Sequence, residues 1–532
     1  MTEENKESKK SKFLKGALIL AVAGILCRVL GVVFRVPLTN IVGNFGMGLY
    51  QMVFPLYALL LIVSSAGVPV AISKMIARKD ADIKKILVNA LILLGAIGLG
   101  FSVLFAVLSH PIAAMQGNKD VGVIYLAIAP SVFLVCLISA FRGYFQGLQN
   151  MIPTAVSQLI EQGVKMAVGI TLALVLIDKG VVWAVFGAIL AVTVSELVAL
   201  GYLVISYFVG RKRLVGTGDS SPRLVKEARN DKWFDKKIMK EIIKQSLPIT
   251  AMASIFPLIL VFDSLVIINL LKVAGSSGKE ATQLFGIQSG AVHTLINLPA
   301  VIGVALATAV VPAISKLLKQ DKQKEMRTHA GLAVKLSVIV SIFFVVFYLL
   351  FASRIIDLLY HDAFKDNEEH FRIATHLLKI ESAMILLMGI SMVFSAMLQA
   401  ADRSKLPLIA LAIGGGAKVI FELIFITTPM GVYAVSISNV ICFCVAAVLN
   451  TIFALRTFKL KGKFMRVGAK VVALTLGYLA ALWVLGAVIP TGRWWLILIG
   501  GVGAVFFGIF VFFLKMFDKS EQNVIKLLRS SK

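Results

Sequence analysis

Apolar residues run along this chain in long stretches that short polar segments interrupt. Most of the stretches reach the roughly 20 residues that one helix needs to cross a bilayer. The pattern predicts an all-α polytopic membrane protein with about fourteen transmembrane helices. We expect these spans near residues 13–38, 46–73, 86–109, 121–141, 152–177, 181–208, 246–271, 284–314, 331–352, 374–400, 406–428, 430–455, 468–489 and 494–516.

Composition agrees with a membrane protein. Hydrophobic residues make up 58% of the 532 residues and the mean hydropathy is +0.90, whereas a soluble chain contains about 45–50% apolar residues. The basic N-terminus precedes an apolar segment long enough to span, and this segment has no convincing cleavage site. We therefore expect it to remain as the first helix.

Positive charge alternates between the two sides of the predicted topology. Forty of the 54 lysines and arginines fall in connections on the same side as the N-terminus, and eight fall in the opposite connections. Cytoplasmic loops hold the excess of basic residues in membrane proteins. The alternation predicts a multi-pass membrane protein with both termini in the cytoplasm. It also explains the net charge of +26 without a nucleic-acid partner.

The chain divides into two halves that repeat. Ala-Ile-Ser-Lys follows Val-Pro at residues 68–74 and again at 311–316, with one residue fewer between the two motifs. A Gln, Pro and Gly-x-Lys series ending at Lys165 returns in the same order, ending at Lys418. Six spans separate the equivalents, which predicts a parallel repeat with a substrate path between the halves. The expected parts are an N-terminal lobe at 1–209, a basic cytoplasmic connector at 210–245, a C-terminal lobe at 246–456, and two extra spans with a tail at 457–532.

Several motifs resemble one family of membrane transporters. Residues 27–31 (Cys-Arg-Val-Leu-Gly) with Arg35 are similar to the opening of MurJ-type flippases, and residues 297–308 and 311–316 look like the span-eight signature of that family. Residues 43–51 and 142–153 are similar to its SpoVB branch. Where many MurJ-type proteins have an Asp-Arg pair, this chain has His293-Thr294. The superfamily comprises multidrug, oligosaccharidyl-lipid and polysaccharide exporters.

The resemblance implies a fold and a function. The fold is two six-helix lobes arranged as a V, and the function is alternating-access export of a sugar linked to undecaprenyl pyrophosphate, with lipid II as the expected substrate. Other lipid-linked polysaccharide units, from capsule, teichoic or spore-cortex synthesis, and a drug–cation antiporter are the alternatives. The cell-wall synthesis machinery is an expected partner.

Two arginines of the first span are candidates for binding the pyrophosphate. Arg28 and Arg35 are two helical turns apart and share one face, and a guanidinium donates paired hydrogen bonds to phosphate oxygens. A charge in hydrocarbon costs roughly 2.5–3.5 kcal/mol on insertion scales, so such residues normally face protein or water. Arg35 near the end of its span also fits snorkelling to the interface.

Charged residues of the repeat are the next candidates. Glu161 with Lys165, and Lys418 with Glu422, lie four positions apart, which permits ion pairs along each helix. Duplicated lysines suit an anionic substrate, and the alternative is two neutralised pairs that only lower the cost of insertion. Arg142 at the cytoplasmic rim fits substrate binding or the positive-inside rule equally.

Lone carboxylates in spans are candidates for coupling or gating. Glu196 and Asp263 have no close partner in sequence, and such residues commonly mark a site for a proton or another coupling ion such as sodium. Glu161 and Glu422 are further candidates for coupling or gating. Lys379 and Glu381 are weaker candidates because they point to different faces. The four cysteines lack the spacing of metal ligands, and no nucleotide-binding loop or catalytic grouping occurs. We expect no cofactor, no structural metal and no enzymatic activity.

Overall fold

The computed structural model describes residues 3–78, 82–216, 234–458, 464–490, 492–518 and 521–522. These residues form helices joined by short connections, and no strand occurs among them. Helices are expected because a chain in lipid must satisfy its backbone hydrogen bonds internally. The chain forms two compact units: unit 1 comprises Met1–Asn269 and Ser277–Gln283, and unit 2 comprises Leu270–Ser276 and Leu284–Lys532.

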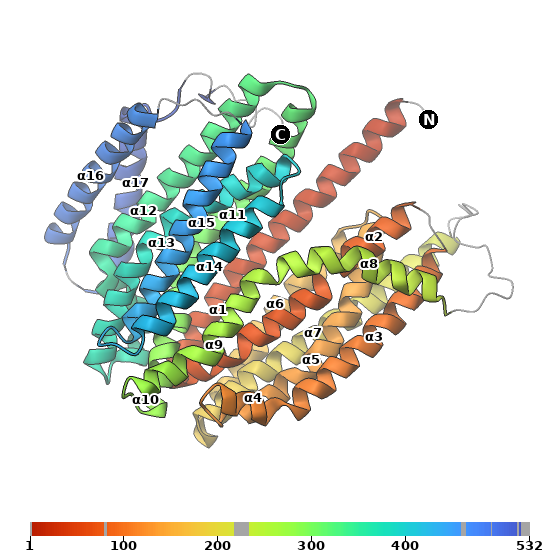
Figure 1. Ribbon diagram of the computed structural model, residues 1–532, viewed down its shortest axis with the longest axis horizontal. Coiled ribbons are helices and arrows are strands. Elements are labelled where there is room, and N and C mark those ends of the chain that lie inside the picture. The colour runs from red at the N-terminus through yellow and green to blue at the C-terminus, as the bar shows by residue number, and fades with distance from the viewer. Residues whose placement is uncertain are drawn as a thin grey trace. The chain divides into compact units, whose positions relative to one another are not determined.

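Unit 1 contains the first helices of the chain (Figure 1). In order they are α1 (Glu3–Ser65), α2 (Val68–Arg78), α3 (Ile83–Val107), α4 (Ser109–Met115), α5 (Val121–Gly147), α6 (Ile152–Leu176), the short helix η1 (Ile177–Lys179), α7 (Val181–Gly216), α8 (Lys236–Ala253), most of α9 (Ile255–Val273) and most of α10 (Gly278–Phe285).

Unit 2 contains the remaining helices, beginning with a π-helix. In order they are η2 (Gly286–Val292), α11 (His293–Lys319), α12 (Gln323–Phe364), α13 (Glu368–Ala400), α14 (Lys405–Phe425), α15 (Val432–Phe458), α16 (Phe464–Val488) and α17 (Trp495–Phe513).

Thirteen segments among the described residues are long and apolar enough to cross a membrane. One of them, Ile19–Arg78, contains 60 residues and covers the first two predicted spans. It turns at Gly43, whose φ of 67° lies in the left-handed region that favours glycine. The prediction of an all-α protein with about fourteen spans is confirmed.

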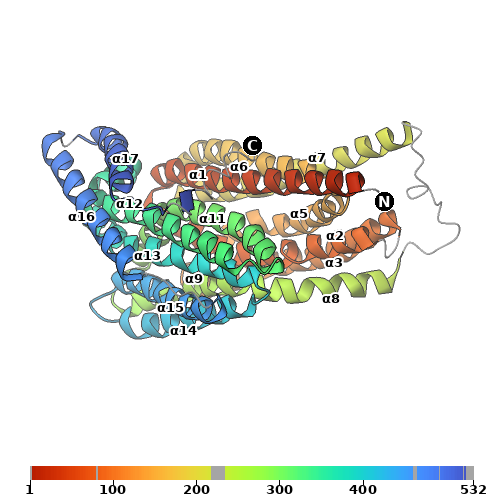
Figure 2. The same cartoon turned by 90° about the horizontal axis from the view of Figure 1, so that it is seen from above.

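The two units repeat one packing order. In unit 1, α3 packs on α5, α5 on α7, and α6 on α7. In unit 2, α12 packs on α13, α13 on α15, and α14 on α15, and Figure 2 shows the last pair side by side. Lys165 on α6 and Lys418 on α14 therefore occupy matching places in the two units, as the sequence repeat predicts.

Helices α16 and α17 form an addition to unit 2, where they pack on each other and on α12 (Figure 1). Contacts between three aromatic rings join α16 and α17 to α12. The ring centroid of Phe343 on α12 lies 5.5 Å from that of Tyr478 and 5.4 Å from that of Phe507. The sequence repeat also leaves the last two spans outside the duplicated part.

The predicted connector consists of two helix ends and a segment outside the described residues. Helix α7 extends to Gly216 and α8 begins at Lys236, while residues 217–233 lie outside the description. The Asp235 carboxylate caps α8 by accepting a hydrogen bond from the Lys237 N–H at 2.9 Å, and this bond lowers the pKa of Asp235. The backbone N–H of Asp235 donates to Asn89 Oδ1 on α3 at 2.7 Å, which fixes the start of α8 on unit 1.

The boundary between the two compact units lies later in the chain than the boundary predicted between the two lobes. The prediction begins the C-terminal lobe at residue 246, yet α8 and α9 as far as Asn269 belong to unit 1. Hydrogen bonds of polar side chains join α9 and α10 to the rest of unit 1. Gln116 Nε2 donates to Ser264 Oγ at 3.2 Å, Asn269 Nδ2 to the Met115 carbonyl at 2.7 Å, and Asn118 Nδ2 to Thr282 Oγ1 at 3.2 Å. The predicted lobe boundary therefore describes the sequence repeat rather than the contacts.

A glycine allows α10 to approach α1 closely. A Cβ atom added to Gly48 would lie 2.1 Å from the backbone oxygen of Thr282, which no side-chain rotation can relieve. We expect Gly48→Ala to destabilise the protein by at least about 1–3 kcal/mol, the usual cost of overpacking. Thermal unfolding of the purified protein should give a lower midpoint.

The matched control is Gly201→Ala on α7, where an added Cβ meets nothing within 4 Å. An alanine in an open helical position stabilises a helix by up to about 1 kcal/mol. An unfolding midpoint for Gly48→Ala that equals or exceeds that of Gly201→Ala would contradict the close approach.

Candidate functional site

The predicted cations of unit 1 gather around α1, α5 and α6. Arg28 and Arg35 lie on α1, Arg142 lies on α5, and Lys165 lies on α6. The Lys165 ammonium interacts electrostatically with Arg35 and with Glu161. The fold therefore brings Arg35, Glu161 and Lys165 together from distant parts of the sequence. We call these residues, with Arg142, Glu196 and the nearby Arg28 of α1, the unit 1 cluster.

Glu161 forms its ion pair across two helices. The Arg142 guanidinium contacts Glu161 Oε2 at 2.9 Å through Nη2 and donates to Ser157 Oγ at 3.1 Å through Nε. The spacing of Glu161 and Lys165 permits an ion pair along α6, but the carboxylate contacts the arginine of the neighbouring helix instead. These contacts fix the Arg142 side chain of α5 against α6. The Lys165 ammonium has no direct contact with a carboxylate among the described residues.

Arg35 and Lys165 lie over aromatic rings. The Arg35 guanidinium carbon is 5.3 Å from the centroid of the Phe54 ring, and the Lys165 ammonium is 5.9 Å from the centroid of Phe34. Such contacts contribute about 0.5–2 kcal/mol. Within the described part of the chain, neither cation forms an ion pair with a carboxylate. An aromatic face positions a cation without neutralising it, so both charges stay available.

The aromatic rings form a ladder along α1 on both sides of the turn at Gly43. Tyr50 lies 6.5 Å from Phe34 and stacks on Phe54 at 5.6 Å, and Phe54 contacts Tyr57 at 5.9 Å, measured between centroids. Tyr50 is almost fully buried. The ladder therefore provides a rigid support that spaces the two cations. The sequence analysis missed it, although Tyr50, Phe54 and Tyr57 lie at helical spacing.

Arg28 differs from its neighbours because it is exposed. Arg35, two turns further along α1, is only partly exposed. No hydrogen bond or ion pair of the Arg28 side chain occurs with other residues that the structure describes. Of the two arginines predicted to share one face of α1, Arg28 is therefore exposed and Arg35 is partly enclosed.

Glu196 on α7 is fully buried and accepts a hydrogen bond from the Tyr57 hydroxyl. Its second oxygen has no hydrogen-bond partner among the described residues. Asp263 on α9 is also buried. The coupling or gating roles of both carboxylates stay predictions.

The lysine at the matching place in unit 2 has another environment. Lys418 is 2% exposed, and its ammonium contacts Glu422 Oε1 at 2.8 Å. The Ser438 hydroxyl donates to the same oxygen at 2.7 Å. The pair is buried and neutralised, so Lys418 cannot meet a ligand in this structure. These contacts favour the alternative of a structural ion pair with Glu422 over substrate binding by Lys418.

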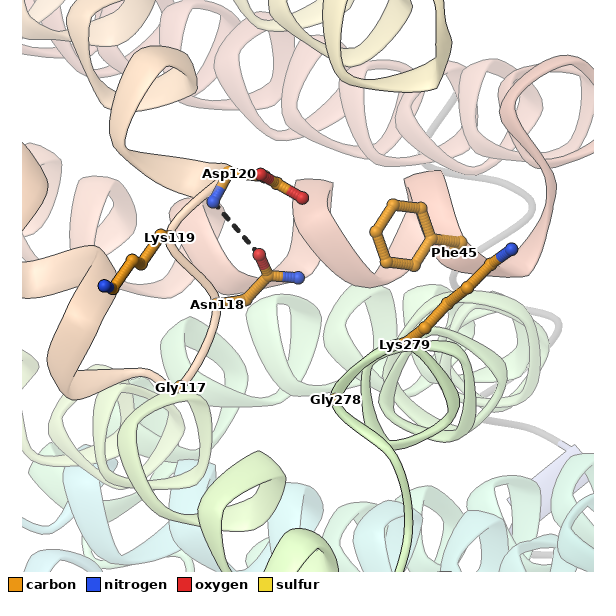
Figure 3. Close-up of a pocket in the computed structure, with 7 residues that line it drawn as sticks. All are labelled: Phe45, Gly117, Asn118, Lys119, Asp120, Gly278 and Lys279. Carbon is orange, nitrogen blue, oxygen red and sulfur yellow. Dashed lines mark hydrogen bonds between the residues drawn. The ribbon is translucent and has the colours of Figure 1, made fainter.

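A pocket of about 330 Å³ opens elsewhere on unit 1 (Figure 3). Phe45 of α1, the connection before α5 and the start of α10 line it. The Asn118 side chain accepts a hydrogen bond from the Asp120 N–H at 3.0 Å and stabilises this connection. No residue of the predicted site lines the pocket. The described residues also contain no group of three or more histidines, cysteines or carboxylates that could hold a metal ion.

The described residues form a helical membrane protein with thirteen candidate spans. The family model described as "Polysaccharide biosynthesis protein" matches residues 13–318, and the model described as "MatE" matches residues 289–424. The chain belongs to the polysaccharide biosynthesis protein family. This family comprises transporters and flippases rather than enzymes, which confirms the expectation of no enzymatic activity.

Relatives and a solved structure agree with this membership. Stage V sporulation protein B of Bacillus subtilis (strain 168) is 33% identical over 358 residues, which cover 66% of this chain and 67% of that protein. Lipid II flippase MurJ of the same organism is 26% identical over 77% of each chain. The structure described as "Lipid II flippase MurJ, inward closed conformation" has a TM-score of 0.70 at 16% identity and covers 94% of this chain and 99% of that one. The resemblance to MurJ-type and SpoVB-type proteins is confirmed.

Proposed function

We propose that the protein is a flippase that moves a sugar linked to undecaprenyl pyrophosphate from the cytoplasmic to the outer leaflet. The observation behind this proposal is the pair of cations Arg35 and Lys165, which lie over aromatic rings and form no ion pair with a carboxylate among the described residues. Arg28 adds a third cation that is exposed. A diphosphate is the part of such a substrate that needs this charge.

The two cation types contribute differently to binding. The guanidinium of Arg35 presents a planar fork of donors that matches two phosphate oxygens, while the ammonium of Lys165 acts as a point charge. Charge-assisted hydrogen bonds of this kind contribute about 1.5–3 kcal/mol each. Arg142 is already bound by Glu161 and Ser157, so we assign it to positioning α5 on α6.

Lipid II is the first substrate to consider. One relative has the name lipid II flippase MurJ, and another has the name Stage V sporulation protein B. The second name refers to sporulation, so precursors of the spore cortex stay candidate substrates. Capsule and teichoic precursors with the same diphosphate are candidates too. A drug–cation antiporter fits less well, because the unit 1 cluster holds four cations and two carboxylates.

Alternating access supplies the transport step in this proposal. Both termini would lie in the cytoplasm and the protein would act in the bacterial cytoplasmic membrane beside the cell-wall synthesis machinery. The energy would come from the membrane potential, which is worth about 2.3 kcal/mol per charge per 100 mV, or from a gradient of protons or sodium ions. Glu196 and Asp263 are the candidate coupling residues of unit 1.

The test is a flipping assay with the purified protein in vesicles. Lipid II, an undecaprenyl diphosphate with a different glycan, and a cationic dye are offered separately. We expect transport of at least one diphosphate-linked glycan and none of the dye. Transport of the dye alone would contradict the proposal, and transport of only the second glycan would exclude lipid II while keeping the class.

A further inference from the structure

Unit 2 contains a buried carboxylate that the proposed function does not use. Glu381 on α13 is 0% exposed. Its Oε1 atom accepts three hydrogen bonds, from Gln288 Nε2 at 2.8 Å, from Ser436 Oγ at 2.8 Å and from Asn439 Nδ2 at 3.2 Å. These donors come from the π-helix η2 and from α15. The three hydrogen bonds stabilise the negative charge of the carboxylate on Oε1.

The other oxygen of Glu381 is in the opposite situation. Oε2 has no hydrogen-bond partner among the described residues, and a ring nitrogen of His293, Nδ1, faces it at 3.7 Å. That Nδ1 atom also has no hydrogen-bond partner in the described part of the chain. Buried polar atoms without partners are rare, and each one calls for a ligand, a proton or a water.

We propose that Glu381 and His293 form a proton-binding site, with the proton held between Glu381 Oε2 and His293 Nδ1. In the neutral tautomer of His293 that carries its hydrogen on Nε2, two lone pairs face each other across the gap when the proton is absent. One proton taken from water converts them into a donor and an acceptor, and the net charge of the pair changes from −1 to 0. A charge-assisted N–H···O bond is about 2.7–2.9 Å long, so the bond closes part of the 3.7 Å gap.

The surrounding groups favour a proton over a metal ion. Gln288 Oε1 accepts a hydrogen bond from Ser289 Oγ at 2.7 Å, which orients the amide so that its N–H points at Glu381. Ser436 and Asn439 also present hydrogens to the carboxylate. A hard cation needs several oxygen lone pairs, and these neighbours offer donors instead. Histidine changes its charge between pH 5 and 8 when it is unperturbed.

Other titratable groups lie on the elements that pack against α13. On α12, the hydroxyls of Tyr348 and Tyr360 donate to the carbonyls of Leu295 and Ala291 at 3.1 and 3.3 Å. Further groups on these helices include the Lys418–Glu422 pair on α14, Tyr433 and Arg456 on α15, His370, Arg372, His376 and Lys379 on α13 itself, Lys316 and Lys319 in the last turn of α11, and Lys335, Arg354, Asp357 and His361 on α12.

The position of the site connects it to the backbone. His293 is the first residue of α11 and directly follows η2, which also supplies Gln288. Short π-helices are rare and occur frequently at functional sites. Closing the gap between His293 and Glu381 would therefore draw the start of α11 toward α13. The use of this movement for transport rests on the proposed function, but proton binding itself does not.

The experiment measures thermal unfolding of the purified full-length protein from pH 5 to pH 8 without any lipid-linked substrate. The unfolded histidine also binds a proton as the pH falls, so the site stabilises the protein because the folded pair holds the proton more tightly, and this contribution is lost as the pH rises. We expect the wild-type midpoint to rise from pH 8 to pH 5. Glu381→Gln, whose amide mimics the protonated carboxyl, and His293→Asn should each remove most of this rise. His376→Asn, an exposed histidine on α13, should keep the wild-type profile.

Two outcomes would overturn the assignment. One is a wild-type pH profile in the His293→Asn protein, which tests the site even where Glu381→Gln fails to fold. The other is a shift on exchange of potassium for sodium at constant pH that Glu381→Gln abolishes, which would show a metal ion instead. Since no substrate is present, failure of this test leaves the flippase proposal intact, and failure of the flipping assay leaves the proton site intact.

Discussion

The double variant Arg35→Gln/Lys165→Gln should flip the lipid-linked glycan at least about 100-fold more slowly than the wild type at low substrate concentration. Each lost charge-assisted hydrogen bond to phosphate costs about 1.5–3 kcal/mol, and 1.4 kcal/mol corresponds to a factor of ten in binding. The rings of Phe34 and Phe54 remain, so the ladder on α1 keeps its packing. The measurement is the initial rate of flipping in vesicles.

Arg493→Gln is the matched control. Arg493 also lies over an aromatic ring, with its guanidinium carbon 5.9 Å from the centroid of Trp494, but it precedes α17 and is outside the unit 1 cluster. We expect flipping at the wild-type rate. Equal rates for the double variant and for Arg493→Gln would remove the role proposed for the two cations.

Lys418→Met should destabilise the protein by about 3–5 kcal/mol, because it leaves Glu422 buried without its counter-charge. Glu422 and Lys418 are both almost inaccessible to solvent, so water cannot replace the lost contact. The double variant Lys418→Met/Glu422→Met should recover most of the loss, since apolar residues of similar size can replace a buried pair. Unfolding midpoints of the three proteins measure both effects.

Lys165→Met provides the comparison at the matching place in unit 1. Lys165 is partly exposed and contacts no carboxylate within the described part of the chain, so its removal should change the unfolding midpoint only slightly while slowing flipping. The account predicts opposite outcomes for the two repeat-related lysines. A larger loss of stability for Lys165→Met than for Lys418→Met would contradict it.

Hydropathy was enough to predict the helices of this protein. Apolar stretches of sufficient length must become helices in lipid, so the spans follow from sequence even where α1 turns at Gly43. The duplicated motifs also predicted the repeated packing order. The unit boundary was harder to predict, because hydrogen bonds such as that of Asn269 with the Met115 carbonyl join segments far apart in sequence.

The partners of the charged residues could not be predicted from spacing alone. Glu161 lies four residues before Lys165, yet it binds Arg142, which is 19 positions away on a neighbouring helix. Helical spacing shows which residues can meet along one helix, whereas packing between helices decides which contact forms. For the same reason the sequence undervalued Glu381, whose donors come from other helices.

The central claim is that Arg35 and Lys165 recognise a diphosphate, and binding of two simple lipids tests it most directly. Titration calorimetry should give the affinities of undecaprenyl diphosphate and undecaprenyl monophosphate for the wild type and for Arg35→Gln/Lys165→Gln. We predict that the wild type binds the diphosphate more tightly and that the variant loses most of this preference. An unchanged preference for the diphosphate in the variant would contradict the account.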